Sequence, residues 1–397
     1  MKKTINIMAS FVFVMALAGI LIVASASEDG KVMEFSQILR SNAVRQVLWL
    51  GLSLAAGLLV LCVDYRVYKR HDFILFVYFV TLVALTLVFV PYIGYGAKGS
   101  RRWLNLQLFM VQPSEFAKLA VVALTCAWVD YAGTHMRRFK EGILYPGAAF
   151  ALVAFLVAIE VDVGATMVMA VAFGAVLFVG GARPKHLLLV ELVGFLAMAA
   201  LVATNANRRV RVAAFVQAKY NVELVLPGMD REELAAQVKV IRDHAEQSTE
   251  ALRNGGFFGR GYMYSEQKKG FLREAYTDFI AAIVGEEFGF FGECLLILGY
   301  VVIFVCGLLI SRRAPDRFGQ LLAFGMSFLL VFQAAVNLGV VTDFLPTTGI
   351  TLPFMSYGGT SLLASMIAVG VILNVGHKAA LAKLSDDANV YRDAVRI

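Results

Sequence analysis

The feature that most constrains the fold is a succession of apolar runs, each roughly 17 to 25 residues long, the length that crosses a bilayer as a helix. Hydrophobic residues make up 59% of the 397 residues and charged residues only 16%, whereas soluble domains carry about 25% charged residues. Backbone amides in hydrocarbon must be satisfied within each segment, which favours helices. We therefore predict an all-α integral membrane protein with ten transmembrane helices, over residues 7–26, 46–63, 73–93, 115–131, 143–159, 164–182, 186–204, 289–310, 318–340 and 361–375.

The loops between these runs predict the orientation of the chain. An even number of spans places both termini on one side, and every short loop on that side is basic, as in Arg137, Arg138 and Lys140 or in Arg312 and Arg313. Basic loops mark the cytoplasmic side, so both termini are expected to be cytoplasmic. The net charge of +7 follows from the same rule, and we expect no nucleic acid partner.

A polar segment, residues 205–276, separates the seventh and eighth spans. It is too long for a plain connector, and we predict a large extracytoplasmic loop that contains a helix over 231–252. Residues 1–376 then form one membrane domain, and residues 377–397 form a cytoplasmic tail. The four cysteines lie in apolar runs without paired spacing, which indicates neither a disulfide framework nor a metal site.

Asp278 stands where this polar loop meets the eighth apolar run, with Glu286 and Glu287 shortly after it. An ionisable group near the bilayer costs about 2.5 to 3.5 kcal/mol on insertion scales, and it therefore suggests a functional site. The alternative is structural, because acids in a first helical turn suit the helix dipole and Thr277 could cap such a helix. The residues alone leave both explanations of Asp278 open.

Three other polar groups lie at the predicted outer border. Arg102, beside Trp103, has the fork of donors that suits an anionic lipid group, although ordinary headgroup contact would also explain it. Glu115 and Lys118 stand three residues apart on one helix face, either as a buried ion pair or with Glu115 as a first-turn acid. Asp162, two residues before a glycine, fits a functional acid or a turn residue.

Residues 345–361 combine two prolines and three glycines at a membrane border. Irregular backbone cannot face lipid, so we predict a re-entrant loop that lines a protein cavity. A tight structural turn is the alternative. No zinc spacing, Walker loop, dinucleotide fingerprint or Ser-His-Asp order occurs in the sequence.

Four segments together resemble the SEDS family of multispanning peptidoglycan glycosyltransferases, which includes FtsW, RodA and SpoVE. They are RRWLNLQLFMVQPSEFAK, DVGAT, the block from GGFFGRG to REAYTDFIAAIVGEEFG, and PTTGITLPFMSYGGTS. The forms LPFMSYGG and GEEFG make the chain more similar to FtsW than to RodA. The resemblance implies that Asp278 is the catalytic residue. The substrate-binding residues that it implies are Arg102, Trp103, Glu115, Lys118, Asp162, Lys269, Arg273, Glu274, Thr277, Ser356, Gly358, Gly359 and Ser361.

The chain departs from the family pattern at four positions. Arg273 and Tyr276 stand where the family usually has Pro and His, Val161 stands where it has Pro, and Gln107 stands where it has Gly. Asp278 is retained, so the implied reaction is unchanged. The departures affect donor-site detail around Arg273 and Tyr276.

The implied reaction is polymerisation of lipid II into glycan strands at the division septum, in the bacterial cytoplasmic membrane. Asp278 would act as general base on the acceptor sugar hydroxyl, which displaces the undecaprenyl pyrophosphate of the donor glycan with inversion. The family resemblance alone implies a divalent cation, Mg²⁺ or Mn²⁺. Candidates to balance the pyrophosphate charge are Arg102, Arg208, Arg209, Lys268, Lys269 and Arg273.

The implied partners are lipid II, the undecaprenyl-pyrophosphate-linked glycan, a class B penicillin-binding transpeptidase and other membrane proteins of the divisome. An elongation-type polymerase, a lipid II flippase and a scaffold for a division complex are the alternatives. A flippase would share the inward-facing ionisable groups and the re-entrant loop. Against it, Asp278 lies at the outer border of the predicted spans rather than in mid-membrane.

Overall fold

The computed structural model describes residues 1–27, 42–97, 100–107, 109–160, 162–204, 206–220, 231–268, 272 and 275–394, and these residues are mostly helical. Three short helices, η1 (Tyr65–Lys69), η2 (Gly133–Arg137) and η3 (Lys140–Leu144), lie between the long ones. The helices that contain the predicted spans are α1 (Lys2–Ser27), α3 (Asn42–Cys62), α4 (His71–Leu87), α5 (Pro113–Ala132), α6 (Tyr145–Ile159), α7 (Val163–Val179), α8 (Pro184–Thr204), α11 (Ile280–Arg313), α12 (Arg317–Val341) and α13 (Gly359–Ala394).

The apolar runs predict the helices well but not all of their ends. By length and composition, seven of the described helices could cross a membrane, which makes this a multi-pass membrane protein. The count of ten spans stays a prediction, because α4 and α7 have only 17 residues each and α8 is not among the seven. α4 stops at Leu87 instead of residue 93, since Pro91 lacks the N–H that a continuing helix needs.

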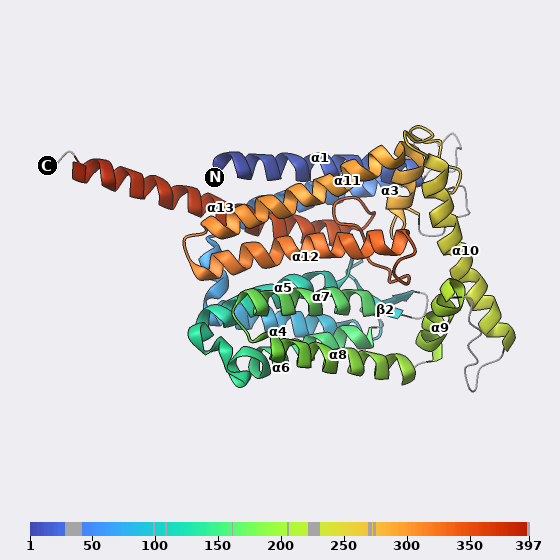
Figure 1. The fold of residues 1–397 in the computed structure, drawn as a ribbon, viewed down its shortest axis with the longest axis horizontal. Coiled ribbons are helices and arrows are strands. Elements are labelled where there is room, and N and C mark those ends of the chain that lie inside the picture. Colours follow the sequence, from blue (N-terminus) through green and yellow to red (C-terminus); the bar gives the residue numbers. More distant parts are fainter. Residues whose placement is uncertain are drawn as a thin grey trace.

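α12 is the central helix of the bundle because it packs against both halves of it (Figure 1). One half contains α1, α3, α11 and α13, and the other contains α4 to α8. A Cβ built on Gly325 of α12 would lie 2.7 Å from Val122 of α5 and 2.9 Å from Val176 of α7. The missing side chain therefore allows three helices to approach closely, as small residues do in membrane bundles.

The last helix runs past the predicted end of its span. α13 continues to Ala394, so the tail predicted at 377–397 extends the helix over its described part and projects away from the bundle (Figure 1). Lys378 Nζ of this helix lies 2.8 Å from Asp64 Oδ2. The N-terminus lies at the same end of the bundle (Figure 1), and its cytoplasmic placement stays a prediction.

A small antiparallel sheet corrects the all-α prediction. Strands β1 (Gly94–Ala97), β2 (Ser100–Asn105) and β3 (Met110–Val111) pair in the order β1-β2-β3. Tyr95 stands opposite Trp103, and Leu104 stands opposite Val111. Strand pairing satisfies backbone groups where the chain leaves α4 and returns in α5, because no helix covers them there. Arg102 and Trp103 are therefore held on a strand.

Two helices, α9 (Ala206–Tyr220) and α10 (Arg231–Gly255), form a cap across the end of the bundle opposite the N-terminus (Figure 1). α10 confirms the helix predicted over 231–252, whereas α9 was not predicted. Lys219 Nζ donates to the carbonyl oxygen of Asp343 at 2.6 Å, and Ser248 Oγ donates to that of Val341 at 2.7 Å. The His244 ring stacks on Phe279. The cap is therefore fastened to the end of α12 and to the start of α11.

The chain between the cap and α11 crosses that helix at glycines. Gly289 has φ 66° and ψ −164° inside α11, and a Cβ built there would lie 2.4 Å from the backbone nitrogen of Gly259. The Phe290 N–H donates to the carbonyl oxygen of Gly256 at 2.9 Å. A side chain at Gly289 would be strained by the backbone and blocked by the crossing loop.

Glu286 and Glu287 of α11 are both buried, and their carboxylates hold this loop through hydrogen bonds. The Ser265 hydroxyl donates to Glu286. Lys268 Nζ lies 3.2 Å from Glu287 Oε1, and the Ser25 hydroxyl donates to the same oxygen. Lys268 was predicted as a candidate to balance pyrophosphate, but it is 8% exposed and its charge is used inside the protein.

A polar cluster at the end of the bundle opposite the cap joins η1 to α12. Asp316 caps α12 by accepting from the Gly319 N–H at 2.8 Å, and it also accepts from the Tyr65 hydroxyl and from Arg66 Nε at 3.2 Å. Burial raises the pKa of Asp316, but the hydrogen bonds from Tyr65, Gly319 and Arg66 outweigh it, and the pKa lies below its ordinary value. Burial and Asp316 raise the pKa of Tyr65, so its hydroxyl remains a donor.

We predict that Asp316→Ala lowers the free energy of unfolding by about 1 kcal/mol at neutral pH, the usual cost of losing an N-cap. Because the folded-state pKa of Asp316 lies below the ordinary 3.8, its contribution is present above that value and is lost as the pH falls through the folded-state pKa. Thermal unfolding in detergent at neutral and strongly acidic pH measures this difference. Asp72→Ala, in the first turn of α4, is the matched control. An equal deficit of Asp316→Ala at both pH values would contradict the assignment.

Candidate active site

Asp278 lies in a turn directly before α11, and its backbone is held by three hydrogen bonds. The Tyr357 N–H donates to the carbonyl oxygen of Tyr276 at 2.8 Å. The Ser356 hydroxyl donates to that of Thr277 at 2.6 Å, and Asn337 Nδ2 donates to that of Asp278 at 2.8 Å. Three consecutive carbonyl oxygens that no helix satisfies are therefore paired with α12 and with the segment before α13.

The groups that hold this turn are themselves fixed. Asn337 Nδ2 also donates to the carbonyl oxygen of Ile350 at 2.7 Å, and the Leu352 N–H donates to the Ser356 hydroxyl at 2.8 Å. Asn337 and Ser356 are buried. The segment 342–358 is not helical, and its residues 350 and 352–356 are buried. This agrees in part with the re-entrant loop predicted over 345–361, whose residues 359–361 belong to α13, and its role in lining a cavity stays a prediction. Such a network sets the position of a side chain before any ligand arrives.

Arg102 and Asp278 approach the same point. A Cβ built on Gly349 would lie 3.6 Å from Arg102 Nη1 and 3.7 Å from Asp278 Oδ2, and Gly349 has φ +72°. Arg102 Nη1 also lies 3.9 Å from Asp162 Oδ1. The site therefore brings a half-buried carboxylate and a guanidinium together over a residue without a side chain.

Asp162 is a buried acid whose oxygens are used by the protein. It caps α7 by accepting from the Ala165 N–H at 3.1 Å, and its other oxygen accepts from Gln112 Nε2 at 3.0 Å and from the Ser114 hydroxyl at 3.3 Å. The structural role predicted for Asp162 is confirmed, since it caps α7, whereas its role in substrate binding stays a prediction. Its contacts orient the guanidinium toward the site.

Glu115 and Lys118 form the predicted buried pair, with Lys118 Nζ 2.9 Å from Glu115 Oε1. Lys118 also donates to Gln333 Oε1 at 2.6 Å, and Gln333 Nε2 donates to the carbonyl oxygen of Thr351 at 3.0 Å. The Thr351 and Ser361 hydroxyls are 2.7 Å apart. These contacts connect α5, through α12, to the segment before α13 that contacts the Asp278 turn.

The start of α13 packs tightly against α3. A Cβ built on Gly359 would lie 2.0 Å from the Trp49 ring, so no other residue fits there without rearrangement. Gln46 Nε2 donates to the carbonyl oxygen of Ser356 at 3.1 Å, and Gln46 Oε1 accepts from the Gly358 N–H at 3.4 Å. Ser356, Gly358 and Gly359, which were predicted to bind substrate, thus lie at the junction between the non-helical segment and α13, next to α3.

Glu160 is a second carboxyl beside Asp162, at the end of α6, and it is 1% exposed. Burial, and then the charge of Asp162, raise its pKa to about 9, although Arg102 opposes the shift. Within the described residues neither carboxyl oxygen has a hydrogen-bond partner. The raised pKa favours the neutral form of the Glu160 carboxyl.

The structure brings Asp278 and Arg102 together at Gly349, and Ser356 holds Thr277. Asp162 faces Arg102, while Glu115, Lys118 and Ser361 are linked to one another through Gln333 and Thr351. Trp103 follows Arg102 in β2 and is half-buried. Lys269, Arg273 and Glu274 lie outside the described residues, so their predicted roles stay predictions. Arg209 lies on α9 of the cap.

Sequence reasoning missed Gln333 and Asn337. They stand four residues apart on α12, so both project from one face of an apolar helix. Two amides in a membrane span are expensive and point to a polar interior. That signal was available in the sequence, whereas the backbone carbonyls that Asn337 serves could not be read from it.

The family of the chain follows from its whole length. A model of the FtsW/RodA/SpoVE family, described as cell cycle protein, matches residues 6–381. The stage V sporulation protein E of Bacillus subtilis is 35% identical over 84% of this chain and 86% of its own. A protein named probable peptidoglycan glycosyltransferase FtsW, from Geobacter sp. strain M18, is 38% identical over 79% of this chain and 80% of its own.

Two solved structures share the fold. One, from a study of how a peptidoglycan synthase complex coordinates polymerization and crosslinking, has a TM-score of 0.70, 26% identity, and coverage of 94% of this chain and 97% of that chain. The rod shape determining protein RodA of Thermus thermophilus has a TM-score of 0.64 and 24% identity over 94% of this chain and 96% of that chain. The motifs, the bundle and these matches agree, and the chain belongs to the FtsW/RodA/SpoVE family.

Proposed function

We propose that the protein is a peptidoglycan glycosyltransferase that polymerises lipid II, with Asp278 as its general base. The observation that carries this proposal is the Asp278 turn, whose backbone is held by Tyr357, Ser356 and Asn337 while its side chain shares the space over Gly349 with Arg102. Relatives at 34% to 38% identity that are named probable peptidoglycan glycosyltransferases support the reaction class.

The proposed step transfers one proton and exchanges one C–O bond. Asp278 takes the proton of the acceptor sugar hydroxyl of lipid II, and the oxygen attacks the anomeric carbon of the lipid-linked glycan. The bond from that carbon to the pyrophosphate breaks, undecaprenyl pyrophosphate leaves, and the anomeric centre is inverted. A positioned general base contributes roughly 10² to 10⁴-fold to such a rate.

Arg102 is placed to balance the negative charge that develops on the leaving pyrophosphate. Fixed cations act strongly in a water-poor site because they need no reorganisation during the reaction. Asp162 lies 3.9 Å from Arg102 Nη1 and holds the guanidinium, while Gln112 and Ser114 hold Asp162. In this proposal Asp162 acts through Arg102 and does not touch the reacting atoms.

A divalent cation stays a prediction from the family resemblance. Among the residues that the structure describes, no group of three or more His, Cys, Asp or Glu side chains could hold a metal ion. The oxygens of Asp162 are already engaged by Gln112, Ser114 and Ala165. The described residues thus show no cluster that would hold a metal by protein ligands alone, and the proposed step uses the side chains of the chain itself.

The finer features of topology and assembly complete the proposal. Ten spans, with both termini cytoplasmic, place the cap and Asp278 on the extracytoplasmic side, where lipid-linked disaccharides are polymerised. The solved relative comes from a complex that couples polymerization with crosslinking, which supports a class B penicillin-binding transpeptidase as partner. Similarity to FtsW proteins supports work at the division septum with other divisome membrane proteins.

We predict that Asp278→Asn lowers lipid II polymerisation by at least about 100-fold, because the amide cannot accept the proton. The measurement is glycan chain formation from labelled lipid II by the purified protein with its cognate transpeptidase. Asp343→Asn, at the end of α12, is the matched control and should leave the rate unchanged. Equal thermal stability of both variants excludes unfolding as the cause. Polymerisation by Asp278→Asn at the wild-type rate would overturn the proposal, and lipid transport without polymer would favour a flippase.

We predict that Ser356→Ala lowers the turnover rate by about 10-fold or more with little change in KM, because a misplaced reacting group costs rate before affinity. Ser356→Thr, which keeps the hydroxyl for the Thr277 carbonyl, should recover most of the activity. Ser327→Ala is the control, since Ser327 is also buried and donates within α12 to Ala323. If Ser327→Ala loses as much activity at the same loss of stability, Ser356 has no positioning role.

A further inference from the structure

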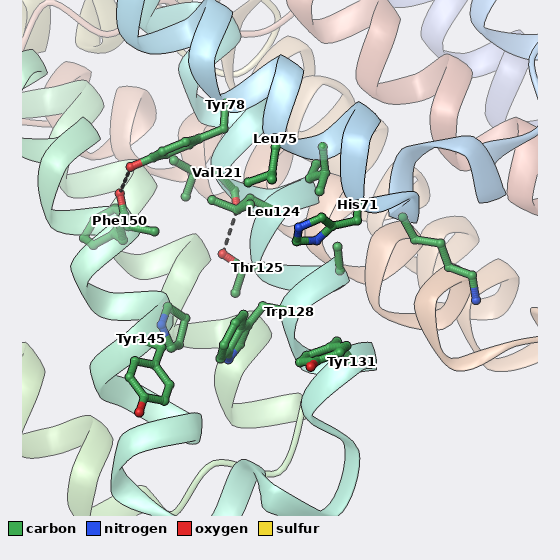
Figure 2. A pocket seen from close by; sticks show the side chains of 15 residues that line it. His71, Leu75, Tyr78, Val121, Leu124, Thr125, Trp128, Tyr131, Tyr145 and Phe150 are labelled. Carbon is green, nitrogen blue, oxygen red and sulfur yellow. Dashed lines mark hydrogen bonds between the residues drawn. The ribbon is translucent and has the colours of Figure 1, made fainter.

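A cavity of about 690 Å³ lies between α4, α5 and α6 (Figure 2), and Asp278 is not among the residues that line it. Its lining comes from the start of α4, the end of α5 and the start of α6, so it lies toward the end of the bundle opposite the cap. Tyr78 and Phe150 close its inner end, and Trp128, Tyr131 and Tyr145 lie around its outer end (Figure 2). The volume falls within the roughly 300 to 1,000 Å³ of ligand sites.

The polar groups in the interior of this cavity donate their hydrogens to the protein backbone. The Tyr78 hydroxyl donates to the carbonyl oxygen of Ala149 at 2.9 Å, and the Thr125 hydroxyl donates to that of Val121 at 2.6 Å (Figure 2). Trp128 Nε1 donates to the carbonyl oxygen of Glu141 at 2.7 Å. Most other lining side chains are apolar. Water needs polar partners to occupy such a space, so the occupant that fits is a hydrocarbon chain.

The outer end of the cavity has the chemistry of a membrane interface. Trp and Tyr are the residues that gather at headgroup level, and Tyr131 is 84% exposed. Lys69 Nζ lies 3.4 Å from Asp130 Oδ2 and keeps 40% of its side chain exposed. Cations outnumber acids on the surrounding segments, which carry Lys69, Arg70, Arg137, Arg138 and Lys140 against Asp72, Asp130 and Glu141.

We propose that this cavity binds one acyl chain of a membrane phospholipid whose anionic head group rests at Lys69 and His71. If the cavity were unfilled, the apolar side chains that line it would lack contacts on the side facing the cavity, and the contact energy lost there favours occupation. The bound chain completes the packing of α5. Glu115 and Lys118 lie near the other end of α5, so the lipid supports the helix that carries this pair without reaching the site itself.

The test uses the full-length protein in nanodiscs of phosphatidylcholine that contain a few percent of phosphatidylglycerol with a photoreactive group on the distal part of one acyl chain. After irradiation, mass spectrometry maps the label. We expect the cavity walls at Leu75, Leu124 and Ala149 to be labelled several-fold more than Leu59, which is 69% exposed on α3. Equal labelling of the cavity walls and of Leu59 would overturn the proposal.

Two variants sharpen the result. Ala149→Trp fills the cavity and should reduce wall labelling to the level of Leu59, whereas the control Leu59→Trp should leave it unchanged. Persistent labelling of the walls in Ala149→Trp overturns the site.

Lys69→Gln is a surface change that keeps the fold and should reduce the preference for phosphatidylglycerol over a phosphatidylcholine probe about fivefold. Equal labelling of the wild type by both probes overturns the anionic head group, and displacement by a polyprenyl phosphate probe overturns the phospholipid assignment.

Discussion

The structure depends on one constraint of backbone chemistry. Where the chain stops being helical inside a membrane protein, each backbone carbonyl oxygen needs a hydrogen-bond donor from the protein itself. The chain leaves helical geometry on both sides of the candidate site, before α11 and before α13. Side chains of Asn337, Ser356 and Gln46 then supply the donors. Each of them satisfies a carbonyl and, by doing so, fixes the position of the two irregular segments relative to each other.

This constraint explains why the site needs so many buried polar residues that do not touch a substrate. Gln333 accepts from Lys118 and donates to the Thr351 carbonyl, so it serves an ion pair and the backbone at once. A half-satisfied network would cost more than an apolar interior. The polar interior of the bundle therefore holds the non-helical segments in place. The side chains of Asp278 and Arg102 both approach Gly349.

Much of the fold could be predicted from the sequence, because the length of an apolar run in a membrane protein nearly determines a helix. The ten runs, the helix at 231–252 and the non-helical backbone at 345–358 all follow from hydropathy and from prolines and glycines, whereas residues 359–361 belong to α13. The sheet at β1 to β3 did not follow, since its strands are short and one face carries Arg102. α9 was missed because the arginines in its sequence obscure the apolar pattern of the face that packs on α10 at Val210 and Ala214.

The site could be predicted in part, by a different kind of reasoning. Asp278 and the pair of Glu115 and Lys118 are conspicuous because a charge in an apolar sequence needs an explanation. Asp162 could be placed only as an acid at a turn, since its partners Gln112 and Arg102 come from other elements. Ser356 serves the backbone of Thr277, a contact that depends on three-dimensional register and leaves no pattern along the chain.

The central position of α12 has a consequence for biogenesis. α5 precedes α12 by more than a hundred and eighty residues, so it enters the membrane before Gln333 exists to accept from Lys118. During that interval Glu115, three residues earlier on the same helix, is the partner already present. An intrahelical pair neutralises both charges at the moment of insertion. When α12 is synthesised later, Lys118 gains its contact with Gln333, and the pair then links the two halves of the bundle.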